Sequence, residues 1–230
     1  MELLIFPEDG SKYASGILER LFELAGGAAL GGPFPSSYVK YSASPNSAAR
    51  SARWMSVKNA GDVRDRGDMC RHMAEHISRG PGAFVLFHFD ADCRWSDRKK
   101  SVARQERFHR DIVLTVARLP RDPCRPQGDP LGVELVQSRL IVMIPFWCLE
   151  SWLYCNAPEA LAELQCSANG FDDVERPWDK CTLRKSRNQL LVQKLNGHAL
   201  VGFSPSFSAF VDDLRGRAEL VAELTRGRCE

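Results

Sequence analysis

The chain has 230 residues, of which 44% are hydrophobic and 26% charged, the balance of an ordinary water-soluble globular protein. The formal net charge is only +2, so overall charge does not single out nucleic acid or any other charged partner. No stretch approaches the roughly 18 consecutive apolar residues that a spanning helix needs, and the first residues do not resemble a secretory signal, so we expect no membrane segment and a cytoplasmic location.

The first elements follow from the apolar pattern. Residues 2–6 are apolar after Glu2 and predict a short buried strand. A helix follows the turn at Pro7–Ser11, because apolar residues recur at helical spacing: Ile17, Leu18, Leu21, Phe22 and Leu24. Gly26–Ser37 is rich in glycine and proline, which predicts a connector, and Tyr38–Ser42 predicts a second strand.

The middle of the chain alternates in the same way. Asp62–Ser78 predicts a helix, and Pro81-Gly82 ends it before the apolar strand Ala83–Asp92. Asp97–Leu119 predicts a long polar helix with a sparse apolar stripe. Pro120–Gly132 carries four prolines and predicts a surface loop.

The last third begins with the most hydrophobic strand candidate, Ser138–Pro145, which leads into a predicted helix at Phe146–Tyr154. Further helices are predicted over Pro158–Gln165, over Lys180–Leu195 and, as one or two segments, over Ser206–Leu224. Trp152 and Phe207 are expected in the core.

This order of strands and helices predicts an α/β fold, with a parallel sheet of about four strands and helices on both faces. We expect residues 1–165 to form the α/β core. Residues 166–230 would form a helical C-terminal extension packed on that core.

Two carboxylates end the third predicted strand. Asp90 and Asp92 stand at positions i and i+2, so in an extended chain their side chains share one face. Two such carboxylates repel each other, and a divalent cation such as Mg²⁺ removes the repulsion and prefers oxygen ligands. The alternative is that these residues cap the helix that follows.

Two more acidic residues follow predicted strands, Glu8 after the first and Glu150 beyond the fourth. The carboxyl ends of parallel neighbours meet at one edge of a sheet, where metal ions could activate water for attack on a phosphodiester. Glu8 is alternatively a surface turn residue. Glu150 is a metal ligand, an acid that orients one, or a structural acid paired to an arginine such as Arg139.

Basic and aromatic residues near these acids have two interpretations. Lys180 would stabilise charge on a phosphoryl transition state, or is simply solvated. The segment from Arg94 to Arg110 carries seven Arg or Lys against Asp97 and Glu106, which suits either a phosphate backbone or a solvated helix face. Trp95 would stack a base, although packing is the preferred interpretation, and His88 is expected to be a core histidine.

No phosphate-binding loop, dinucleotide-binding loop or Gly-x-Ser-x-Gly motif is found in the sequence. The chain is therefore not expected to hydrolyse ATP itself, and any dependence on ATP would need a partner.

The ordered set of motifs resembles the Toprim domain, a metal-binding α/β module of topoisomerases, primases and the overcoming-lysogenisation-defect nucleases. Glu8 matches its glutamate after the first strand, and Asp90-Ala91-Asp92 its Asp-x-Asp. Three further segments resemble a compact Toprim-like family of bacterial defence loci: Ile144–Tyr154, with Glu-Ser-Trp where that family has Glu-Ala-Trp; Arg176–Lys180; and Ser204–Val211. One departure is Asp9, which separates Glu8 from Gly10.

The resemblance implies a Toprim-like Rossmannoid fold and a metal-dependent nuclease that acts as effector of an anti-phage defence system. Glu8, Asp90 and Asp92 would hold Mg²⁺ or Mn²⁺, with Glu150 and Lys180 assisting catalysis. The implied partners are DNA or tRNA and other RNA, a separate ATPase subunit, and a second copy in a homodimer. The alternative function is a non-catalytic adaptor or regulatory subunit that docks the ATPase.

Overall fold

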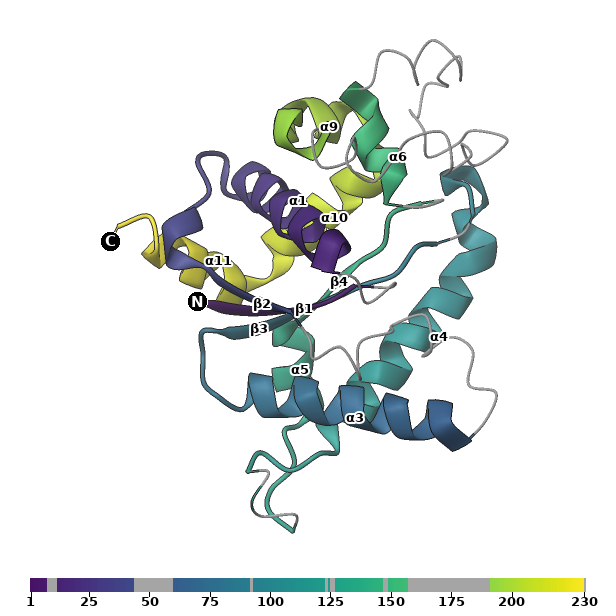
Figure 1. Cartoon of the computed structure of the whole chain (residues 1–230), viewed down its shortest axis with the longest axis vertical. Helices are drawn as coiled ribbons and strands as arrows, with labels where there is room; N and C mark the ends of the chain where they lie inside the picture. Colours follow the sequence, from purple (N-terminus) through teal and green to yellow (C-terminus); the bar gives the residue numbers. More distant parts are fainter. Residues whose placement is uncertain are drawn as a thin grey trace.

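The computed structural model in Figure 1 describes most of the chain. The described residues are 1–7, 12–43, 60–91, 93–122, 124, 127–146, 149–156 and 191–229. Among them, no helix has the length and apolar character needed to cross a membrane.

A four-stranded parallel sheet forms the centre of the molecule, in the order β2-β1-β3-β4. The strands are β1 (Glu2–Phe6), β2 (Lys40–Ala43), β3 (Ala83–His88) and β4 (Leu140–Met143). Phe6 pairs with Phe87 where β1 and β3 end, and His88 pairs with Met143 where β3 and β4 end. β3 is buried along its whole length, as expected of a strand covered on both faces.

Helices cover both faces of the sheet, and the predicted α/β fold is therefore confirmed (Figure 1). Side chains of β1 and β3 alternate between two apolar cores, with Leu3, Ile5, Phe84 and Leu86 in one core and Leu4, Phe6, Val85 and Phe87 in the other. The first core contains side chains of α1 (Lys12–Leu30), α6 (Glu150–Leu153), α9 (Gly197–Phe203), α10 (Pro205–Gly216) and α11 (Ala218–Arg226). The second contains those of α3 (Ala60–Ile77), α4 (Arg98–Ala117) and α5 (Val133–Arg139).

The helices that follow β1 and β3 lie on opposite faces of the sheet. Helix α1 comes after β1 and lies on one face, and α4 comes after β3 and lies on the other (Figure 1). The short turn η1 (Ser36–Tyr38) precedes β2, and η2 (Trp95–Asp97) precedes α4. Neighbouring parallel strands with this arrangement form a topological switch point, and in open α/β sheets ligands bind just outside the carboxyl ends of the strands there. The fold thus marks the edge next to Phe6 and His88 as the place for a site.

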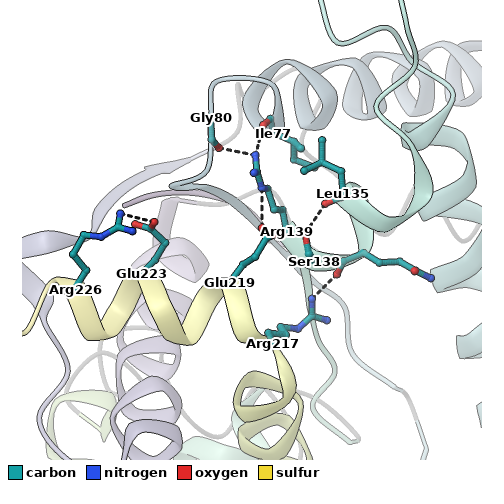
Figure 2. A network of polar contacts seen from close by, with 10 residues as sticks. Ile77, Gly80, Leu135, Ser138, Arg139, Arg217, Glu219, Glu223 and Arg226 are labelled. Atoms are coloured by element: carbon teal, nitrogen blue, oxygen red, sulfur yellow. Dashed lines mark hydrogen bonds and ion pairs between the residues drawn. The ribbon is translucent and has the colours of Figure 1, made fainter.

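The helices near the C-terminus belong to the same core as α1. Among them, α11 is tied to the opposite, amino edge of the sheet (Figure 2). Buried Arg139 donates to the carbonyls of Ile77 and Gly80 at 3.0 and 2.6 Å and pairs with Glu219 of α11 at 3.3 Å. Arg217 donates to the carbonyls of Gln137 and Leu140 at 2.8 and 3.0 Å. These arginines join the start of α11 to the turn before β3 and to the junction of α5 and β4.

The prediction that Gly26–Ser37 is a connector is wrong at its start, because α1 continues to Leu30. A Cβ built on Gly26 would lie 2.5 Å from the ring of Phe34, so glycine here allows close packing rather than ending the helix. Ala25 and Ala28 beside it are buried, so this turn belongs to the core.

Other boundaries moved by a few residues. The predicted strand Ala83–Asp92 ends at His88, and the predicted strand Ser138–Pro145 begins only at Leu140, because Ser138 and Arg139 end α5. Of the helix predicted over Phe146–Tyr154, the described residues form α6 at Glu150–Leu153, followed by η3 (Tyr154–Asn156). Trp152 and Phe207 are fully buried, as predicted, and their ring centroids lie 5.0 Å apart. The helix predicted at Pro158–Gln165 lies outside the described residues, as does most of Lys180–Leu195.

Candidate metal centre at the carboxyl edge of the sheet

The segment after β3 continues beside the segment after β4. The N–H of Phe89 donates to the carbonyl of Met143 at 3.3 Å, and the N–H of Ala91 donates to that of Pro145 at 2.9 Å. These two bonds hold Asp90 between them at the carboxyl edge. Main-chain bonds between the two segments therefore hold the backbone of Asp90 in place.

The Asp90 carboxylate is largely enclosed, with its side chain 12% exposed. Oδ1 accepts the N–H of Leu149 at 2.8 Å and lies 3.4 Å from Nε2 of His88. Leu149 stands at the N-cap position of α6, so Asp90 binds the start of the short helix that follows β4. The alternative that Asp90 caps the helix after it is therefore wrong, because Arg94 and Asp97 occupy the N-cap positions of the next two helical segments.

His88 is buried on β3, as predicted for a core histidine, and its side chain is 4% exposed. His88 and Asp90 stand at i and i+2, so the alternation of the strand turns both side chains to the same face. The i, i+2 spacing of His88 and Asp90 is the signal of this contact in the sequence.

Glu150 begins α6 and is partly buried. It directly follows Leu149 in the chain, and the bond from Leu149 to Asp90 therefore brings Glu150 to the same edge of the sheet as Asp90. The alternative that Glu150 pairs with Arg139 is wrong, because Arg139 precedes β4 at the other edge and pairs with Glu219.

Glu8, Asp92 and Lys180 lie outside the described residues. Within the described residues, no group of three or more His, Cys, Asp or Glu side chains is gathered for a metal ion. The expected set of Glu8, Asp90 and Asp92 consists of carboxylates, whose oxygens suit Mg²⁺ or Mn²⁺. Asp90 fits such a set in chemistry and in its place at the switch point.

A group of aromatic and basic side chains lies close to Asp90 in the chain. Trp95 in η2 packs edge-to-face on Phe146, with ring centroids 4.8 Å apart, and the guanidinium of Arg98 lies over the Trp95 ring at 4.5 Å. Trp95 does pack, as preferred from the sequence, and it remains partly exposed. The spacing of Trp95 and Arg98 at i and i+3 is the only signal of this contact in the sequence.

Comparisons of the chain with protein-family models, with curated proteins and with solved structures found no match.

Proposed function

We propose that the chain is a divalent-metal-dependent nuclease that hydrolyses phosphodiester bonds of DNA or RNA. The observation that carries the proposal is the switch point between β1 and β3. Glu8 follows Phe6 by two residues and Asp90 follows Phe87 by three, and Phe6 and Phe87 are paired where these strands run side by side. The two strands that precede these carboxylates in the sequence thus end side by side at the edge where α/β sheets bind ligands, which supports the proposal.

In this proposal Glu8, Asp90 and Asp92 hold Mg²⁺ or Mn²⁺, which would polarise the phosphodiester and lower the pKa of a water molecule. The N–H of Leu149 donates to Oδ1 of Asp90 and would orient that carboxylate, while His88 lies 3.4 Å from the same oxygen. Glu150, next to Leu149, assists at the same edge, and Lys180 stabilises charge on the transition state.

The resemblance to the Toprim-like family supports a cellular role as the effector of an anti-phage defence system, controlled by an ATPase partner. The absence of a phosphate-binding loop from the sequence is consistent with a separate ATPase. A homodimer and a cytoplasmic location belong to the same proposal.

The test is cleavage of plasmid DNA and total tRNA by purified protein with Mg²⁺ or Mn²⁺. Asp92→Asn should reduce cleavage to background. Asp90→Asn keeps an oxygen acceptor for Leu149 but loses the charge, and should reduce the rate about 10- to 100-fold. Asp212→Asn is the matched control, because Asp212 is an exposed aspartate on α10, and it should cleave like wild type. Equal cleavage by Asp92→Asn and wild type would contradict the proposed site.

One observation favours the second candidate, an adaptor that docks an ATPase without catalysis. Asp90 already serves the fold by binding the start of α6, a use that needs no metal. Two results together would favour the adaptor over the nuclease. The wild-type protein would form a stable complex with the ATPase, and the Asp90→Asn/Asp92→Asn variant would still support the defence system.

A further inference from the structure

A layered stack of side chains lies at the carboxyl edge beside Asp90. Phe146 is buried, Trp95 packs edge-to-face on it, and Arg98 lies over the indole ring. Nη1 of Arg98 also donates to the carbonyl of Trp95 at 3.0 Å, which fixes the guanidinium in this place. We call Arg94, Trp95, Arg98 and Lys99 the Trp95 platform.

The main chain holds this stack next to the candidate metal centre. Ala91 and Pro145 are joined by a 2.9 Å backbone bond, and Phe146 directly follows Pro145. Trp95 comes four residues after Ala91, on the turn that begins α4. Both rings of the stack therefore stand just beyond the two strand extensions that enclose Asp90.

The platform begins the most basic segment of the chain. Residues 94–110 carry seven Arg or Lys against two acidic residues, whereas the whole chain has a net charge of +2. Lys99 is exposed, and Arg94 pairs with Asp97 at 2.9 Å between side chains that are 40% and 31% exposed. An ion pair with that exposure is weak, so a phosphate can compete with Asp97 for Arg94.

We infer that the Trp95 platform binds an unpaired nucleotide of the substrate, so that the proposed nuclease acts on single-stranded nucleic acid or on unpaired regions. Indole and guanidinium planes stack on bases of any sequence, and basic side chains bind the adjoining phosphates. In a duplex, each base is already covered by its neighbours on both faces. The inference rests on the proposed function, which places the substrate at the carboxyl edge. The preference for unpaired nucleotides is inferred from the Trp95 platform itself.

The test measures binding without cleavage, by fluorescence anisotropy in EDTA. The probes are labelled single-stranded DNA, single-stranded RNA and the DNA duplex of the same sequence. Wild type should bind at least one single strand more tightly than the duplex, and the DNA and RNA arms identify which. Trp95→Leu keeps an apolar contact for Phe146 but cannot stack, and should weaken single-strand binding about tenfold while duplex binding changes little.

Three more variants separate stacking from charge and from folding. Trp95→Phe keeps a ring and should bind close to wild type. Arg98→Ala should weaken binding and reduce the salt dependence by about one phosphate contact. Arg121→Ala removes an exposed arginine beyond the far end of α4 and should leave single-strand preference unchanged. Circular dichroism and thermal unfolding would verify that each variant is folded.

Equal affinity of wild type for single strands and duplex would overturn the inference, as would a Trp95→Leu variant that binds like wild type or loses both substrates equally. These outcomes are independent of cleavage. A protein that binds single strands through Trp95 but cleaves none of them, even with the ATPase partner added, contradicts the nuclease and leaves the inference about the Trp95 platform supported. If the Trp95→Leu variant cleaves single strands and duplex as well as wild type does, the inference about the Trp95 platform is contradicted and the nuclease is not.

Discussion

Arg139 is the buried cation at the amino edge of the sheet, and most of its contacts are with backbone oxygens rather than with an acid. It donates to the carbonyls of Ile77 and Gly80, whereas its partner Glu219 is 49% exposed (Figure 2). Removing a charged donor from buried carbonyls costs stability, whereas removing an exposed carboxylate from an ion pair costs little. The fold therefore depends on the arginine more than on the ion pair.

Arg139→Ala should lower the free energy of unfolding by about 2 kcal/mol. Glu219→Ala leaves the carbonyl contacts in place and should cost less than about 1 kcal/mol. Urea unfolding of both variants, with the exposed Arg118→Ala as control, measures the difference. Equal losses in the two variants would show that the ion pair carries the stabilisation.

His76 makes stability depend on pH. It is buried on α3, with Nε2 3.4 Å from the carbonyl oxygen of Glu2. Burial lowers its pKa below 6.5, and the charge of Arg79 lowers it further. The folded protein thus keeps His76 neutral where the unfolded chain takes up a proton. The contribution of neutral His76 to the free energy of unfolding is present above pH 6.5 and is lost as the pH falls through the lowered pKa.

Urea unfolding between neutral pH and about pH 5 should therefore show falling stability, with a smaller slope in His76→Gln. An identical slope in wild type and His76→Gln would mean that other groups cause the acid sensitivity.

At the scale of elements, the contact between α9 and α1 depends on a glycine. A Cβ on Gly197 would lie 2.8 Å from the carbonyl oxygen of Leu24, which is backbone and cannot rotate away. Gly202 in the same helix has no atom within 4 Å of such a Cβ.

Gly197→Ala should lower the free energy of unfolding by about 1–3 kcal/mol, because α9 must move off α1. Gly202→Ala should raise it by up to about 1 kcal/mol, because alanine favours the helix. Thermal or urea unfolding of the two variants gives the comparison. A gain in both would mean that α9 is not held closely against α1.

Strands were the elements easiest to predict, because apolar runs between turn residues left few alternatives. Residues 2–6 were predicted as a strand and form β1, and β3 and β4 lie within their predicted ranges. The seven-residue helix α5 was missed because it is too short to show a helical period. The Gly-rich end of α1 was mispredicted because its glycines allow close packing against Phe34, a contact that local helix propensity does not reveal.

At the scale of the molecule, the sequence predicted parallel strands but not their order. The order β2-β1-β3-β4 puts the switch point between the strands that precede Glu8 and Asp90. No local pattern specifies which strands become neighbours, since that depends on how the helices pack. The contacts of Asp90 with Leu149 and His88 likewise required the fold. Glu8, Asp92 and Lys180 remain predictions.

The measurement that tests the central claim most directly is Mn²⁺ binding by isothermal titration calorimetry, because it needs neither the substrate nor a partner. Wild type and Asp212→Asn should bind Mn²⁺ alike, Asp90→Asn should bind it about 10- to 100-fold more weakly, and Asp90→Asn/Asp92→Asn should show no binding while remaining folded. No binding to wild type, or equal binding to wild type and the double variant, would contradict a metal centre at the carboxyl edge of β3.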